Sequence, residues 1–125
     1  MATIGYILLR DDHDSNYLQA FDIGKTDHRF LEKASCESIQ VLKRPKFIEA
    51  LDVLHKGDTF VVSTLSVLST NPRDMLEALQ ALQRKGVTVV FVQEGFNLSS
   101  SLGKAYLAML RSAAKLENTL RHIRV

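Results

Sequence analysis

Short apolar runs that alternate with helical segments constrain this chain more than any other feature of its sequence. Residues 4–9, 59–65 and 87–92 form runs that are apolar almost throughout. Such runs are typical of strands that are buried on both faces of a parallel sheet. Segments with helical spacing precede the second run and separate it from the third. The alternation predicts an α/β fold with three layers, in which helices flank a mainly parallel sheet of four to five strands.

Two helices are predicted from their start and stop signals. Pro45 suits a first helical turn, and apolar residues recur at helical spacing over about 45–56. Asn71 followed by Pro72 is a strong signal for a helix start, and an apolar stripe continues from there to Gly86.

Residues 14–43 are the least legible part of the sequence. Candidate helices span Tyr17–Ile23 and Asp27–Ala34, and a possible strand spans Ile39–Leu42. Gln93–Ser100 is expected to form a loop before the last helix. The sequence does not fix where the elements within residues 14–43 begin and end.

Composition limits the classes of protein to which the chain can belong. It has 125 residues, of which 46% are hydrophobic, and Cys36 is the only cysteine. A chain of this size can build one core without disulfides or metals. The four histidines are scattered, and neither a G-x-G-x-x-G nor a Walker sequence occurs, so we expect no metal and no small-molecule cofactor. We find no signal peptide pattern and no apolar run of membrane length, and therefore expect a cytoplasmic protein without membrane contact.

The charge is distributed unevenly along the chain. Residues 1–103 carry eleven basic and thirteen acidic side chains, whereas residues 104–125 carry five basic and one acidic. A basic arm on a mildly acidic body suggests an anionic partner such as DNA, and a solvated helix face is the alternative. The candidate contacts to DNA phosphates on this arm are Lys115, Arg121 and Arg124.

A long apolar stripe follows residues 101–124 in steps of three and four. A helix of this length reaches about 36 Å, whereas a strand in a small sheet spans about 20 Å. We therefore expect part of the helix to project and to pair with the same helix of a second copy; the alternative is that it folds back on its own sheet. The predicted dimer interface consists of Leu102, Tyr106, Met109, Leu110, Ala113, Leu116 and Leu120.

Segments distributed over the chain resemble the catalytic domain of the serine recombinases, the resolvase and DNA-invertase family. The resemblance covers about 4–9 and 44–124 well. The segments that carry it, in order and spacing, are Ile4–Tyr6, Arg44–Pro45, Ala50–Leu51, Lys56–Val62, Leu65, Leu68, Lys85–Val87, Glu94–Gly95 and Ser99–Gly103.

This resemblance implies an α/β domain over residues 1–100, with residues 101–125 as a long dimerisation helix of the same domain. It also implies a serine that attacks a DNA phosphodiester to form a covalent phosphoserine link, assisted by arginines that neutralise the phosphate. Family members carry a helix-turn-helix DNA reader after the long helix. The chain ends at Val125, so we expect no helix-turn-helix domain in it.

The catalytic motifs of the family are altered here. The first motif, Tyr-x-Arg-x-Ser, reads Tyr6-Ile-Leu-Leu-Arg, so Leu8 occupies the arginine position and Arg10 the serine position. The second motif, Leu-Asp-Arg-Leu-x-Arg, keeps only its two leucines. Its acid and both arginines are replaced by Ser66, Val67 and Thr70.

These replacements predict a catalytically inactive domain. A guanidinium stays protonated and cannot act as the nucleophile, so Arg10 does not substitute for the missing serine. We expect instead a dimerisation or regulatory module of a DNA-bound assembly, which pairs with itself, with an active recombinase or weakly with DNA. One alternative is an active recombinase that uses a relocated serine at position 63, 66 or 69.

One phosphate-binding arginine of the family is retained. Arg44 stands at its matched position, and together with Arg10 it is a candidate ligand for a phosphate. The alternative is that Arg44 is a helix-start side chain paired with a nearby acid. A further alternative for the whole domain is a flavodoxin-like protein that binds a small anion or a nucleotide, although the chain lacks a phosphate loop.

Overall fold

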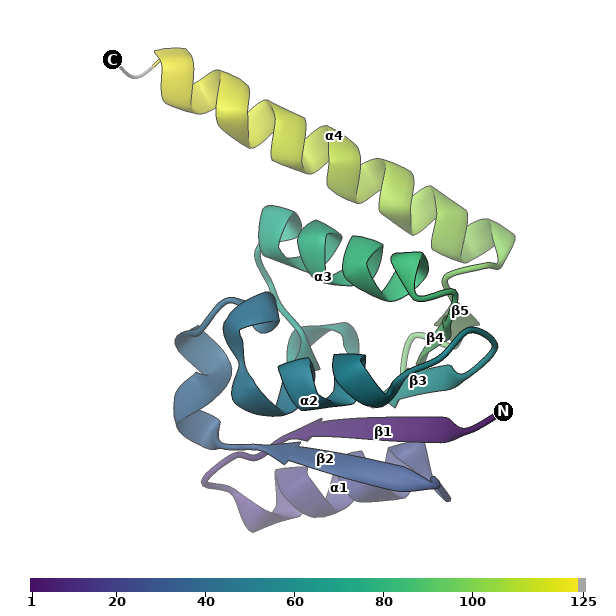
Figure 1. Cartoon of the computed structure of the whole chain (residues 1–125). Helices are drawn as coiled ribbons and strands as arrows, with labels where there is room; N and C mark the ends of the chain where they lie inside the picture. The colour runs from purple at the N-terminus through teal and green to yellow at the C-terminus, as the bar shows by residue number, and fades with distance from the viewer. Residues whose placement is uncertain (124–125) are drawn as a thin grey trace.

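A five-stranded sheet in the order β2-β1-β3-β4-β5 runs through the computed structural model, which describes residues 1–123 (Figure 1). Four strands are parallel, and β5 pairs antiparallel with β4. The strands are β1 (Thr3–Leu8), β2 (His28–Glu32), β3 (Thr59–Val62), β4 (Thr88–Phe91) and β5 (Phe96–Asn97). The prediction of a mainly parallel sheet is confirmed.

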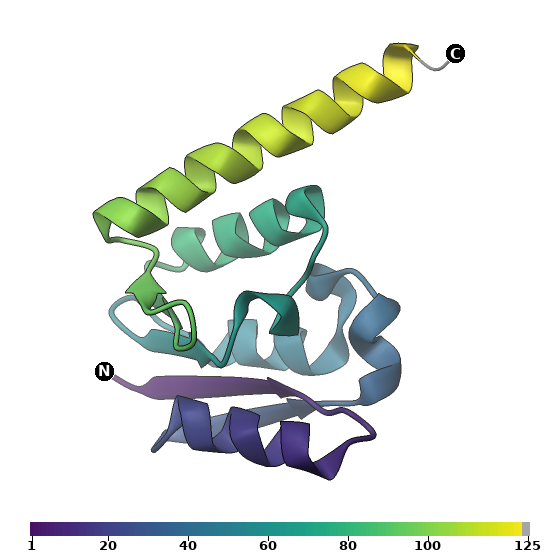
Figure 2. The same ribbon diagram turned by 180° about the vertical axis from the view of Figure 1, so that it is seen from behind.

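Helices cover both faces of this sheet unequally. Helix α1 (His13–Ile23) lies alone on one face, whereas α2 (Pro45–Val53) and α3 (Pro72–Arg84) lie on the other (Figures 1 and 2). Helix α4 (Ser101–Ile123) packs along the outer side of α3. Within residues 1–123, no helix is long and apolar enough to cross a lipid bilayer.

The structure corrects two predictions in residues 14–43. The helix predicted over Asp27–Ala34 is wrong, because residues 28–32 form β2, whose backbone pairs with β1 from Ile4 to Leu8. The strand predicted over Ile39–Leu42 is also wrong. A 3₁₀ turn spans Val41–Lys43 there, because the backbone groups bond to side chains instead of to a neighbouring strand.

Two other boundaries are refined. The predicted helix over residues 17–23 is present and starts earlier, because the Asp12 carboxylate accepts a hydrogen bond from Asp14 N and caps α1. The predicted loop over Gln93–Ser100 contains the short strand β5. Helices α2 and α3 begin at the predicted prolines, and Asn71 caps α3 through Asp74 N.

The main core lies between the sheet and the α2/α3 layer. Tyr6 of β1, Phe47 of α2 and Phe60 of β3 are fully buried, and their ring centroids lie 5.7–5.9 Å apart. Such aromatic packing stabilises the layer beyond the burial of area alone. It fixes β1 beside β3, and their carboxyl ends therefore meet at one edge of the sheet.

Helix α4 is anchored at its start and projects at its end. A Cβ atom on Gly103 would lie 2.2 Å from the Asn97 carbonyl oxygen, so only glycine permits this close approach. Leu107 is buried, whereas Ile123 is 72% exposed. The last turns extend past α3 (Figure 1), which confirms the predicted projection. Arg124 and Val125 lie outside the described residues.

Candidate functional site

A small cleft opens where β1 and β3 end, and it is lined by three of the altered motif positions, Arg10, Ser66 and Val67. Its volume is about 190 Å³. The sheet brings Arg10 to the same cleft as Ser63 and Ser66, although Arg10 lies more than fifty residues earlier in the sequence. Its lining consists of Arg10, Ser15, Leu18, Gln19, Ser63, Thr64, Ser66, Val67 and Gln93.

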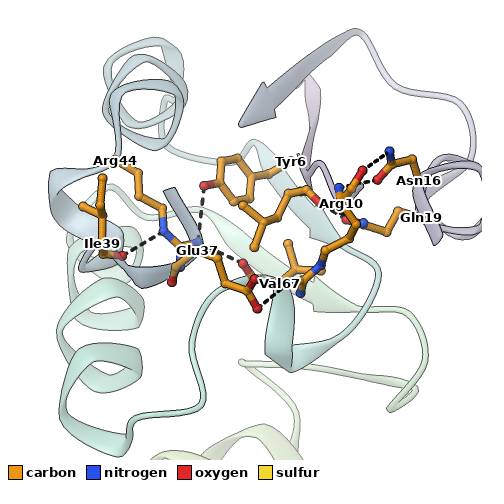
Figure 3. A network of polar contacts seen from close by, with 9 residues as sticks. Tyr6, Arg10, Asn16, Gln19, Glu37, Ile39, Arg44 and Val67 are labelled. Atoms are coloured by element: carbon orange, nitrogen blue, oxygen red, sulfur yellow. Dashed lines mark hydrogen bonds and ion pairs between the residues drawn. The ribbon is translucent and has the colours of Figure 1, made fainter. Parts of the chain in front are cut away.

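Two side-chain amides of α1 hold the backbone at the end of β1. Gln19 accepts a hydrogen bond from Leu8 N (3.1 Å) and donates one to Leu8 O (2.8 Å) (Figure 3). Asn16 does the same for Arg10, accepting from N at 2.6 Å and donating to O at 2.8 Å. These contacts fix the segment that carries residues 8 and 10. The sequence analysis missed both amides, whose spacing of three residues on one helix face was the available signal.

Arg10 is a positioned cation at the edge of this cleft. Its guanidinium forms an ion pair with Glu37, and the Arg10 side chain is 26% exposed (Figure 3). A partly exposed ion pair contributes about 0–1 kcal/mol. An incoming anion can therefore compete with Glu37 for the guanidinium at little cost.

The serines near the cleft have different surroundings. Ser63 is 1% exposed, and its hydroxyl donates a hydrogen bond to Asp22 Oδ2 at 2.8 Å. Gln93 donates to the same carboxylate oxygen at 3.0 Å. Ser66 is exposed at the cleft, whereas Ser69 lines two neighbouring clefts and accepts a hydrogen bond from Asn71 N. Among the described residues, no histidine or lysine forms a hydrogen bond with any of these serines.

The other altered positions do not bring charged side chains to the cleft. Leu8 is fully buried in the main core. Val67 is 2% exposed and belongs to the same core, although its backbone borders the cleft. Thr70 is exposed and lines the two neighbouring clefts beside α3 and α4. Of the altered positions, Arg10 alone brings a charge to the cleft.

Arg44 is buried and occupied by contacts within the chain. The residue as a whole is 2% exposed. Its guanidinium donates hydrogen bonds to the carbonyl oxygens of Ile39 (3.0 Å), Val67 (3.0 Å) and Glu37 (3.2 Å) (Figure 3). It also donates to the Tyr6 hydroxyl at 3.5 Å. The predicted phosphate contact of Arg44 stays a prediction, and the four contacts within the chain hold its guanidinium in place.

A buried carboxylate complements this cation through Tyr6. Glu32 accepts hydrogen bonds from the Tyr6 hydroxyl at 2.9 Å and from the backbone of Lys46 and Phe47 in the first turn of α2. The carboxylate thereby satisfies unpaired N–H groups at a helix start. Burial raises the pKa of the Tyr6 hydroxyl, which therefore stays protonated and donates to Glu32.

The predicted interface residues of α4 divide into two groups. Leu110 is buried in the chain's own core, and Tyr106 packs against Phe91 and Phe96. Burial raises the pKa of Tyr106 to about 12. Ala113 is half-buried between the two groups. The exposed group consists of Leu102, Met109, Leu116 and Leu120, and Ile123 continues it.

The basic residues of α4 are exposed along the helix. Lys115 is exposed, and Arg121 forms an ion pair with Glu117 at 3.0 Å. Of the predicted phosphate contacts, Arg124 lies outside the described residues. The structure therefore places two of the three cations on one projecting helix, separate from the cleft at the end of β1.

Comparison with known proteins identifies the family. The resolvase N-terminal domain model matches residues 15–125. The integrase-like protein y4lS of Sinorhizobium fredii is 31% identical over 102 residues, which cover 75% of this chain and 56% of that protein. The Tn21 resolvase of Escherichia coli is 29% identical over 94% of this chain and 62% of its own. The DNA-invertase hin of Salmonella typhimurium is 27% identical over 96% of this chain and 63% of the invertase.

Solved structures share the fold. The N-terminal catalytic domain of TP901-1 integrase has a TM-score of 0.68 at 19% identity and covers 94% of this chain and 97% of that one. A resolvase family site-specific recombinase from Streptococcus pneumoniae has a TM-score of 0.72 at 18% identity, with coverages of 98% and 91%.

This chain belongs to the resolvase family and carries its N-terminal domain. The match includes residues 15–43, which the sequence resemblance covered poorly. The predicted resemblance and fold class are confirmed. The chain spans 56–63% of the length of the curated relatives named above.

We predict that Arg44→Lys destabilises the domain strongly. A lysine ammonium cannot reproduce the planar fork that reaches three carbonyl oxygens, so buried acceptors lose their donors. We expect a loss of about 2 kcal/mol or more in the free energy of unfolding, measured by urea denaturation. The control is Arg84→Lys on the exposed side of α3, which should change little. Equal effects of the two substitutions would contradict the structural role of Arg44.

Proposed function

We propose that this chain is a non-catalytic recombinase domain that serves as a dimerisation or regulatory module of a DNA-bound assembly. The observation that carries the proposal is the replacement of the family's nucleophile and its charged partners at the ends of β1 and β3. The replaced positions are Leu8, Arg10, Ser66, Val67 and Thr70.

The size of the catalytic loss supports this reading. Removal of one preorganised charge donor typically costs about 10²–10³ in rate. Here a serine nucleophile, an acid and three arginines of the family motifs are absent together. Leu8 is buried in the core and supplies no charge to a phosphate. Without a nucleophile, the covalent phosphoserine intermediate has no route of formation.

A relocated serine is the second candidate function. Ser66 is exposed at the cleft that contains Arg10, which would supply a nucleophile and a cation for a phosphate. Ser63 bonds to Asp22, a possible base, but is almost fully buried. An activated serine needs a base aligned with its hydroxyl and access to the substrate, and neither serine combines the two.

A small-anion site is the third candidate. The cleft holds Arg10 and several hydroxyl and amide groups, and its volume of about 190 Å³ suits one phosphate group better than a nucleotide. The absence of a glycine-rich phosphate loop in the sequence speaks against a nucleotide.

The partner surface of the proposed module is the exposed stripe of α4. Leu116 is 59% exposed, and Met109 and Leu102 lie on the same side of the helix. A stripe of this kind on a projecting helix fits a second copy of the chain or the equivalent helix of an active recombinase. Lys115, Arg121 and Arg124 on the same segment favour a nearby DNA backbone. A cytoplasmic location fits this role and stays a prediction.

The inactive reading predicts no covalent link to DNA. We would incubate the protein with nicked fragments of its host's DNA, which trap recombinases after strand cleavage, and search for nucleotide-linked peptides by mass spectrometry. We expect no adduct, whereas an active resolvase on its own site serves as the positive control. A peptide linked through Ser63, Ser66 or Ser69, and absent from the matching serine-to-alanine variant, would establish the active alternative.

The proposed α4 interface predicts that Leu116→Glu weakens self-association. A carboxylate buried in an apolar seam loses its hydration without a partner, so the contact between two α4 helices should dissociate at least tenfold more readily. Analytical ultracentrifugation measures this change. The control is Ala108→Glu, which is exposed but lies outside the spacing of the stripe. An unchanged sedimentation profile for Leu116→Glu would remove α4 as the interface.

The basic arm predicts weak, salt-dependent binding to DNA of any sequence. Three cations neutralise few phosphates, so the logarithm of the affinity should fall with the logarithm of salt concentration with a slope of about −2 to −3. Fluorescence anisotropy with a labelled duplex measures this slope, and Lys115→Gln with Arg121→Gln should reduce it. Affinity that does not depend on salt would contradict the proposal.

A further inference from the structure

Helix α1 carries three of its four large apolar side chains on the outside, and only Ile23 is buried against the sheet. Tyr17 and Phe21 are each 76% exposed and Leu18 is 57% exposed, whereas Asn16 and Gln19 face the sheet and bond to its backbone. A surface helix normally has the opposite arrangement, with apolar residues inward. Leu18 lines the cleft, whereas Tyr17 and Phe21 belong neither to the cleft nor to the α4 stripe.

The sheet beside α1 continues the apolar surface. Within residues 1–123, α1 is the only helix on this face of the sheet (Figure 1). Leu31 of the edge strand β2 is therefore left 46% exposed. A hollow of about 430 Å³ lies between α1 and β2, and Leu9, Tyr17 and Leu31 contribute to its lining. Single exposed apolar residues are common, but a contiguous group marks an interaction surface. We call Tyr17, Phe21 and Leu31 the α1 patch.

Charges of opposite sign lie at the two ends of this patch. Asp11, Asp12 and Asp14 precede or begin α1 and are exposed. Lys25 and Arg29 follow its other end and are also exposed. Two neighbouring residues reduce this separation of charge. Asp27 lies at the basic end, where its carboxylate accepts a hydrogen bond from Thr3 N. Lys33 follows β2 and lies toward the acidic end.

We propose that the α1 patch binds the α1 patch of a second copy, with the two helices antiparallel. A two-fold axis places the acidic end of one helix against the basic end of the other, so Asp14 faces Lys25 twice in one interface. The patch is therefore complementary to itself in charge as well as apolar. A partner protein without this charge pattern would gain only the apolar contact.

This interface is independent of the α4 stripe, because α1 and α4 lie on opposite sides of the molecule (Figures 1 and 2). A chain with both interfaces forms assemblies larger than a dimer. The α1 interface also stands without the proposed loss of catalysis, since no residue of the patch belongs to the altered motifs.

Four proteins test the proposal by sedimentation: the unaltered chain, Leu116→Glu, Tyr17→Glu with Phe21→Glu, and the combination of all three substitutions. We expect the Leu116→Glu protein to remain a dimer and the combined variant to be a monomer, with self-association weakened more than about tenfold. A monomeric Leu116→Glu protein, or equal masses for it and the combined variant, would overturn the α1 interface. If α4 does not pair, the unaltered chain and the Leu116→Glu protein have equal mass. A loss of mass when Tyr17 and Phe21 are substituted then still supports the α1 interface, and an unchanged mass overturns it.

A charge exchange tests the antiparallel arrangement separately and leaves the apolar patch intact. In the Leu116→Glu background, Asp14→Lys and Lys25→Glu should each weaken the dimer about threefold to tenfold in low salt, and the two together should restore it. Circular dichroism controls for the helix, because Asp14 lies in its first turn. Additive losses without restoration would exclude the antiparallel arrangement.

Discussion

The buried guanidinium of Arg44 is the contact on which the surroundings of the candidate site depend. Burial of a charge costs several kcal/mol unless hydrogen bonds and an opposite charge compensate it. Here the guanidinium binds three carbonyls from two turns, and the Tyr6 hydroxyl links it to Glu32, which binds the first backbone N–H groups of α2. One network therefore positions the end of β1, the start of α2 and the turn after β3. The cleft lies next to this network, because Val67 lines the cleft and its carbonyl oxygen accepts a hydrogen bond from Arg44.

The fold and the chemistry of this domain are separable. The core needs apolar contacts between β1, β3, α2 and α3, and Leu8 and Val67 add to those contacts. Charged groups held together at an active site commonly reduce stability, so the proposed replacement of such groups by Leu8 and Val67 is compatible with the fold. What remains exposed is a set of surfaces. Two of them, the α4 stripe and the α1 patch, are the proposed interfaces with other subunits.

Local signals predicted most of the fold, and contacts distant in sequence explain the errors. β1, β3 and β4 are apolar runs, and α2 and α3 begin at prolines, so each of these elements could be predicted from its own residues. β2 is a short edge strand with charged residues, and its pairing with β1 overrides its local pattern. The turn at Val41–Lys43 depends on Asp74, thirty-three residues from Val41. Arg10 was named as a candidate residue from its motif position, but Asn16 and Gln19 were not, because their partners are backbone atoms.

The sequence by itself determined the class of fold and the family resemblance, because the chemical identity and spacing of side chains do not depend on folding. The proposed loss of the nucleophile and arginines also rests on side-chain identity alone. Only the tertiary structure decided which groups are available. It buried Arg44, paired Arg10 with Glu37, and turned Leu110 inward and Leu116 outward on one helix. The physical reason is that exposure depends on contacts between elements that are distant in the chain, and helical spacing alone does not reveal which side of a stripe the rest of the molecule covers.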